Sequence, residues 1–264
     1  MILAVYWFSG CRKDAGSGPD TGGGRDTLTL GGNPEIVSKT AINSGADLQI
    51  VWRSVESAEG YKVYCDGNQI WSGTNTTYTI VGADNVCRIV EVSAFRGSDE
   101  RKTYIDLTPL SNTITGLVSH DGTGNSWVKI DFSTGDISST RLSSVDPNAP
   151  NTGWFVFYNN AGNPEFRDAS ATSVGSAKME MAFTPSSSGY LAPGTGNYNT
   201  VRGTNNGAYH FFWADNTTTG YGSMDNNDYF GVIMVTSLTG IGPYRADLEI
   251  YVQNKVPGLR WVKF

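Results

Sequence analysis

The chain has 264 residues, enough for two domains, with a net charge of −6 and 32 glycines. An acidic chain without a basic run is poorly suited to nucleic acid, because that kind of binding depends on neutralising phosphates. Abundant Gly, Ser, Thr, Asn and Tyr, without a convincing helical period, favour short strands joined by tight turns. We therefore expect an all-β protein.

Residues 1–11 form an apolar run that ends in small residues and a cysteine. The run is too short to cross a bilayer as a helix, which needs ~20 apolar residues, but it has the length of a signal-peptide core. The tetrad Phe8-Ser9-Gly10-Cys11 resembles a bacterial lipobox. This resemblance implies cleavage before Cys11, a lipid on its thiol, and anchoring to the outer membrane or cell surface. The alternative is a buried N-terminal strand with an incidental cysteine.

Residues 12–33 are mostly Gly, Ser, Asp and Thr, which is the composition of a flexible linker. If Cys11 carries lipid, the other two cysteines, Cys65 and Cys87, form an even pair. Such a pair can make one disulfide in an oxidising compartment. Two unpaired, small apolar side chains are the alternative.

Residues 34–118 contain short alternating runs at 48–52, 61–65 and 90–94. Turn signals such as Asp66-Gly67-Asn68 separate these runs. Short strands at this spacing indicate an antiparallel sandwich.

This first unit resembles a fibronectin type III domain, through Trp52, Tyr61 and the sixth-strand motif at 88–94. Arg88 stands where that motif usually has a tyrosine. The resemblance implies that the third and sixth strands are antiparallel neighbours, with Cys65 and Cys87 at adjoining ends. It therefore supports a disulfide between them, and it implies that the domain separates or presents another module.

Residues 119–264 alternate more strongly, with Val128, Ile130 and Phe132 on one expected face. The run at 229–235 is continuously apolar and predicts a strand buried on both faces. The endings "DLEIYVQN" and "LRWVKF" predict two more strands. We expect a second, larger β-sandwich or jelly roll, whose long loops at 184–207 and 214–228 are suited to binding.

Aromatic side chains in or beside these loops can stack on a glycan or contact a protein ligand. The candidates are Tyr190, Tyr198, Tyr221 and Trp213. Packing in the core is the alternative for a tryptophan in a strand. Three carboxylates, Asp215, Asp225 and Asp228, lie in an oxygen-rich stretch that calcium favours, although ordinary turn chemistry explains it too.

The stretch "SWVKIDFSTGDI", followed by a strand that opens on Trp154, resembles HmuY-type haem-binding lipoproteins. That resemblance implies paired His or Met ligands for haem. The candidates are His210, Met179 and Met181, with core packing as the alternative for the methionines.

The sequence contains no nucleophile–base motif, and its carboxylates are scattered. We therefore expect a membrane-anchored extracytoplasmic lipoprotein that is not an enzyme. Its second sandwich would act as a binding or adhesion module on a type III spacer. The alternatives are the haem carrier and a small secreted glycan-active enzyme.

Overall fold

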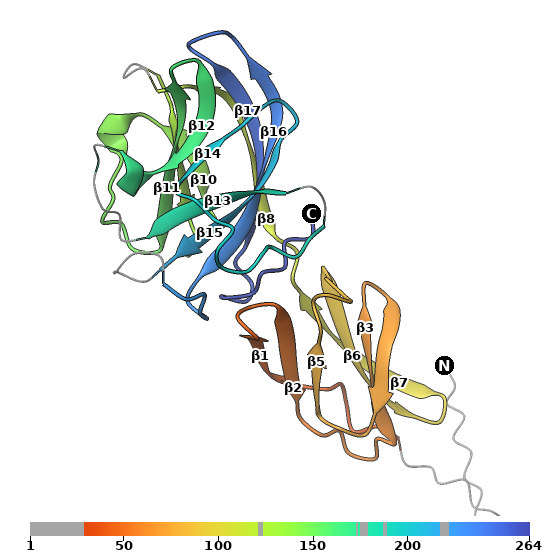
Figure 1. Ribbon diagram of the computed structural model, residues 1–264. Helices are drawn as coiled ribbons and strands as arrows, with labels where there is room; N and C mark the ends of the chain where they lie inside the picture. Colours follow the sequence, from red (N-terminus) through yellow and green to blue (C-terminus); the bar gives the residue numbers. More distant parts are fainter. Residues whose placement is uncertain (1–28, 121–123, 173, 175–178, 187–188, 217–221) are drawn as a thin grey trace, which may run out of the picture.

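The computed structural model describes residues 29–120, 124–172, 174, 179–186, 189–216 and 222–264. Two antiparallel β-sandwiches lie end to end (Figure 1), so the predicted all-β fold class is confirmed. The helical elements among the described residues are two short 3₁₀ turns, Leu142–Ser144 and Ala169–Ala171. Within these same ranges, no helix has the length and apolar character needed to cross a membrane.

The first sandwich packs a sheet in the order β1-β2-β5 against a sheet in the order β4-β3-β6-β7. Alternation along β6 puts Val90, Val92 and Ala94 in its core with no exposed surface, as the sequence predicts. Its strands are β1 Ile36–Ile42, β2 Asp47–Trp52, β3 Gly60–Cys65, β4 Asn68–Gly73, β5 Thr77–Ile80, β6 Ile89–Arg96 and β7 Asp99–Asp106.

A disulfide joins Cys65 to Cys87, which confirms that prediction, with 5.3 Å between the two Cα atoms. It forms because β3 and β6 pair antiparallel, so that Cys65 lies opposite Val90, close to the start of β6. The hairpin from β3 to β4 turns on Asp66 and Gly67, which both have positive φ, at 48° and 82°. Both central residues of a tight I′ turn need this conformation.

The second sandwich packs a five-stranded sheet, β10-β9-β11-β12-β14, against another, β13-β15-β16-β17-β8. Its strands are β8 Leu110–Val118, β9 Trp127–Asp131, β10 Ile137–Thr140, β11 Thr152–Asn160, β12 Asn163–Asp168, β13 Glu180–Ser186, β14 Val201–Gly203, β15 Tyr209–Asp215, β16 Tyr229–Thr239 and β17 Arg245–Gln253. The sequence placed 110–118 in the first unit. In the structure β8 pairs with β17, because its inward-facing Ile114 and Leu117 complete the larger core.

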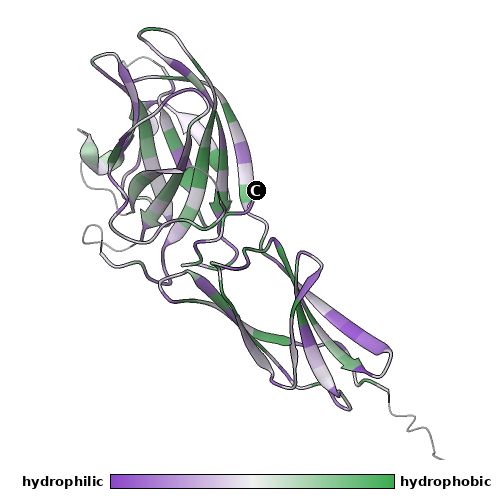
Figure 2. Ribbon diagram, turned by 45° about the vertical axis from the view of Figure 1, so that its right-hand side comes forward, coloured by the Kyte–Doolittle hydropathy of each residue, from purple (hydrophilic) through white to green (hydrophobic). Residues whose placement is uncertain are grey.

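The expected inward face of β9 is confirmed, since Val128, Ile130 and Phe132 all lie in the core between the two sheets. Polar and apolar positions alternate along many of the strands (Figure 2). Strand β16 is buried on both faces, as its continuous apolar run predicts. Ile233 packs in the core between the sheets, whereas Val232 packs in a second cluster on the outer face of its sheet.

The last eleven residues, 254–264, which we call the C-terminal segment, join the two sandwiches. The expected strand "LRWVKF" does not form there, and the segment makes one isolated bridge, between Trp261 and Leu191. Trp261 is fully buried in the core cluster of the first sandwich, and its Nε1 donates a hydrogen bond of 2.7 Å to Ala46 O. The indole ring of Trp261 comes so close to the backbone at position 82 that only glycine fits there, because a Cβ would lie 2.4 Å from Trp261 Nε1.

Candidate binding site at the junction of the sandwiches

A cavity of about 520 Å³ opens where the two sandwiches meet, which we call the junction cavity. This volume is in the range of small-ligand sites. The first sandwich contributes the disulfide end of Cys65, the hairpin residues Asp66 and Asn68, and residues 82–86. The second contributes Gly189, Tyr190, Leu191 and Lys263. The site therefore exists only when both sandwiches are in place.

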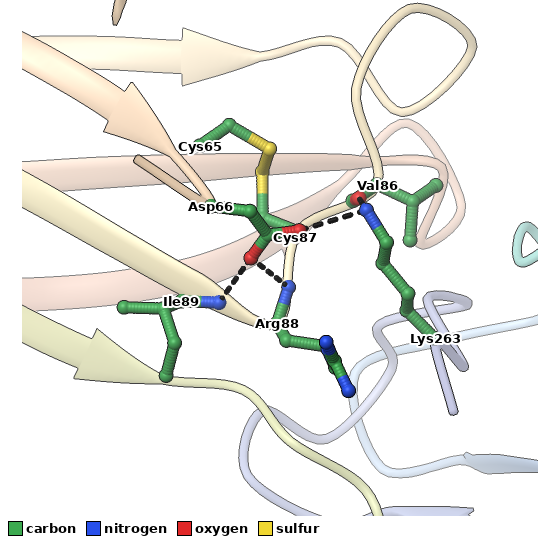
Figure 3. The surroundings of a disulfide bond; sticks show 7 residues. All are labelled: Cys65, Asp66, Val86, Cys87, Arg88, Ile89 and Lys263. Carbon is green, nitrogen blue, oxygen red and sulfur yellow. Dashed lines mark hydrogen bonds and ion pairs between the residues drawn. A yellow bond between two sulfur atoms is a disulfide. The ribbon is translucent and has the colours of Figure 1, made fainter. Parts of the chain in front are cut away.

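Lys263 spans the junction (Figure 3). Its Nζ lies 2.7 Å from Asp66 Oδ2 and donates a second hydrogen bond, of 2.9 Å, to Val86 O. Asp66 Oδ1 in turn accepts hydrogen bonds from the backbone amides of Arg88 and Ile89. Burial acts to raise the pKa of Asp66, but the hydrogen bonds from Lys263 and the two amides outweigh it and hold that pKa below its usual value. One wall of the cavity is therefore a fixed ion pair.

Aromatic rings continue from the cavity over the outer face of the second sandwich. We call Tyr190, Tyr209, Tyr251 and Phe264 the aromatic patch. Phe264 is its centre, with ring centroids 5.5 Å from Tyr190, 6.4 Å from Tyr209 and 4.7 Å from Tyr251. Tyr190 and Tyr209 remain 39% and 41% exposed. Lys263 Nζ lies 5.7 Å from the centroid of the Tyr190 ring, which is within cation–π distance.

The combination has the chemistry of a recognition site. Exposed rings offer flat apolar faces for stacking, and their edges and hydroxyls remain available for polar contacts. Asn68, Asp84, Asn85 and Lys263 place amides and charges around the same cavity. Neither of the two histidines of the chain lines it.

The aromatic residues proposed from the sequence have different environments in the structure. Tyr190 lines the junction cavity. Tyr198 donates a hydrogen bond to Pro193 O and meets Trp213 edge-on, at 5.9 Å between centroids. Trp213 is 3% exposed and lies in the apolar cluster beneath this loop, so it presents no face to a ligand. Tyr221 lies outside the described residues.

The three candidate calcium ligands differ in burial. Asp215 and Asp228 are fully buried, whereas Asp225 is exposed. Asp228 Oδ2 accepts a hydrogen bond from the Asp225 amide, which is the turn chemistry that competes with metal binding. Burial, with the charges of Asp215 and Asp225, raises the pKa of Asp228 to about 7 despite that bond. Within the described ranges, no group of three or more His, Cys, Asp or Glu side chains is arranged to hold a metal ion.

The candidate haem ligands do not converge. Met179 and Met181 have no exposed surface and pack in the core between the sheets. On the β13–β15 ladder, Met181 lies opposite Ala214 and His210 opposite Pro185. Four residues along a strand separate these positions by about 13 Å, too far for both side chains to bind one iron atom in this conformation.

Several residues of the site were not among the sequence candidates, and Asp66, Lys263 and Phe264 are central among them. Asp66 was assigned only to a turn, and Lys263 and Phe264 to a terminal strand. A tight turn next to a cysteine gives a weak signal for Asp66. No sequence signal places Lys263 beside it, because 197 positions separate the two residues.

Compared with protein-family models and with curated protein sequences, the chain has no match. The junction cavity and the aromatic patch are therefore interpreted from their own chemistry. The candidate lipid-anchor residue Cys11 lies outside the described residues.

Proposed function

We propose that this chain is a membrane-anchored extracytoplasmic binding protein, which recognises a glycan or protein ligand without turning it over. The observation that carries the proposal is the junction cavity, where the exposed ring of Tyr190 borders the Asp66–Lys263 ion pair. Both sandwiches contribute to this cavity. The first is therefore part of the binding unit as well as a spacer.

Three further observations support the proposal. The Cys65–Cys87 disulfide is of the kind that persists in oxidising compartments outside the cytoplasm. The first sandwich has three strands packed on four, with Trp52 and Tyr61 in its core, as expected for a type III-like presenting domain. Residues 1–11 supply the lipobox-like tetrad that an anchor needs.

The anchor is tested by replacing Cys11. Expressed in a bacterial host with its complete export signal, the native chain should partition into the detergent phase. The variant Cys11→Ser should become aqueous or remain unprocessed, because serine cannot accept the thioether-linked lipid. Phase partitioning with mass analysis measures both outcomes. Equal mass and equal solubility of the two proteins would refute the anchor without affecting the binding site.

The binding site is tested by screening residues 29–264 on a glycan array and on an array of extracellular proteins. Tyr190→Ala should weaken the strongest hit by ~1–2 kcal/mol, or about five- to thirtyfold in affinity, if the ring is an anchor. The free energy of unfolding should change little, since Tyr190 is 39% exposed. Lys263→Met should also weaken binding, because it removes the charge beside the ring.

The matched control is Tyr104→Ala. Tyr104 is a tyrosine on β7 that is 62% exposed and does not line the junction cavity. Its removal should leave the array hit unchanged. Equal losses in the two tyrosine variants, or chemical turnover of the hit by the native protein, would overturn the proposal.

A further inference from the structure

A second cavity lies at the edge of the large sandwich and shares no lining residue with the junction cavity. It has a volume of about 780 Å³, and we call it the edge cavity. Strands β13 and β14, which end their respective sheets, both contribute to it. Its polar lining includes Asn163, Ser186, Arg202, Thr204, Asn205 and His210, and Tyr209 of the aromatic patch also borders it.

The strand registers turn Arg202 and His210 toward the same interior space. Arg202 pairs directly with Phe166 across β12 and β14, and directly paired residues share a face of the sheet. Phe166 lies in the core between the sheets. His210 alternates along β15 with Phe212, which lies in that same core, so it also points inward. The rings of Phe166 and His210 meet edge-to-face at 5.6 Å.

Both side chains have unused hydrogen-bonding capacity. The Arg202 side chain forms no hydrogen bond or ion pair with the described residues, and its buried Nε is without a partner among them. His210 is 3% exposed, and its Nε2 lies 2.9 Å from Thr204 Oγ1. When the Thr204 hydroxyl donates to Nε2, the ring proton resides on Nδ1, which is buried and lacks a partner in the same part of the chain. Leaving such a donor unpaired costs ~1–3 kcal/mol.

The electrostatics agree with this geometry. Burial and then the positive charge of Arg202 lower the pKa of His210 to about 4. The ring is therefore neutral at physiological pH and adds no second charge to that of Arg202. A half-buried guanidinium beside a neutral imidazole, with no carboxylate of the described residues paired to either, is complementary to an anion.

We propose that the edge cavity binds the oxyanion group of a small ligand, a carboxylate or a phosphate, at the Arg202 guanidinium, next to the neutral His210 ring. Arg202 provides the charge and the planar fork that matches two oxygens. The hydroxyl and amide groups of Ser186, Asn163 and Asn205 contact the rest of the ligand. An acidic sugar and a phosphorylated sugar both carry this chemistry.

Isothermal titration calorimetry distinguishes an acidic sugar from a phosphorylated ligand. The three probes are glucuronate, inorganic phosphate and neutral glucose. Heat from glucuronate alone supports an acidic sugar, and heat from phosphate alone supports a phosphorylated ligand. Binding of both supports a general oxyanion site. Binding of neither at millimolar concentration overturns the proposal, as does equal binding of glucose.

Two variants test whether the measured heat of binding arises at the edge cavity. Arg202→Gln should weaken binding of the successful probe at least about tenfold, because a hydrogen bond to a charged group is lost. The control Arg245→Gln neutralises an exposed arginine on β17 and should have no effect. Unchanged binding in Arg202→Gln, or an equal loss in both variants, rejects the site.

The pKa of His210 is a readout that uses the native protein, so it does not depend on whether a variant folds. A bound anion favours the imidazolium, so the pKa of His210 measured by NMR should rise when the probe is present. The ring of His120, outside the cavity, is the internal reference. No rise at His210 under saturating probe contradicts the proposal. The junction-cavity proposal is independent, because it depends on Tyr190 and Lys263.

Discussion

Replacing Trp261 with alanine should destabilise the first sandwich by ~3–5 kcal/mol, the usual range for removing a large buried aromatic side chain. Trp261 has no exposed surface, although it belongs to a segment that follows the last strand of the other sandwich. The substitution leaves a cavity in a core that the first sandwich builds together with Val256 and Leu259 of the same segment. It also removes the hydrogen bond from Nε1 to Ala46 O.

The loss should be concentrated in the first sandwich. Hydrogen–deuterium exchange of peptides covering β2 should accelerate strongly, whereas peptides covering β11 should change little, because β11 packs in a separate core. Trp261→Phe is the matched variant, since it keeps most of the ring volume and loses the Nε1 donor. Its cost should be smaller, at ~1–2 kcal/mol. Equal stability of Trp261→Ala and the native protein in urea would show that the segment does not hold the sandwiches together.

Removing the disulfide should have the next largest effect. The double variant Cys65→Ser/Cys87→Ser should lose ~3 kcal/mol of unfolding free energy, because the unfolded chain is no longer restrained by a closed loop. The two cysteines are 22 positions apart in sequence. Urea denaturation with and without a thiol reductant measures the loss. The reduced native protein should match the double variant.

The same variant should also lower the affinity of the junction cavity for its ligand. Asp66 and Val86 are the immediate neighbours of the two cysteines, and both are hydrogen-bonded to Lys263. Loosening the disulfide should therefore lower the affinity for the array hit as well as the stability. Lys263→Met separates the two effects, because it should weaken binding with the disulfide intact. Complete alkylation of both cysteines in unfolded, unreduced protein would disprove the bond.

The local pattern of the sequence was sufficient for the inward faces of the central strands, and together with the type III resemblance it predicted the disulfide. Alternation identified the inward residues of β6 and β9, since a strand buries every second side chain against one face. The turn at Asp66 and Gly67 follows from residue types that tolerate positive φ. The disulfide followed from cysteines at the ends of two strands that the type III resemblance made neighbours.

The same pattern was insufficient for β8 and for Trp213. An apolar alternation does not say which sheet a strand joins, and β8 joins β17 by contacts with residues more than a hundred positions away. Aromatic residues near polar loops resemble a binding surface in sequence. Trp213 lies instead under the loop and the C-terminal segment, which cover the outer face of its sheet.

By itself, the sequence determined an all-β chain with two units, the faces of its central strands and the cysteine pair. These properties depend on neighbours along the chain or on one pairing of strands. Only the tertiary structure decided where the cavities lie and which side chains line them. Lys263 meets Asp66 because the C-terminal segment crosses to the first sandwich, and Arg202 meets His210 because two sheet edges face each other. Contacts between side chains so distant in sequence depend on how whole sheets pack, and the alternation within a single strand does not encode that packing.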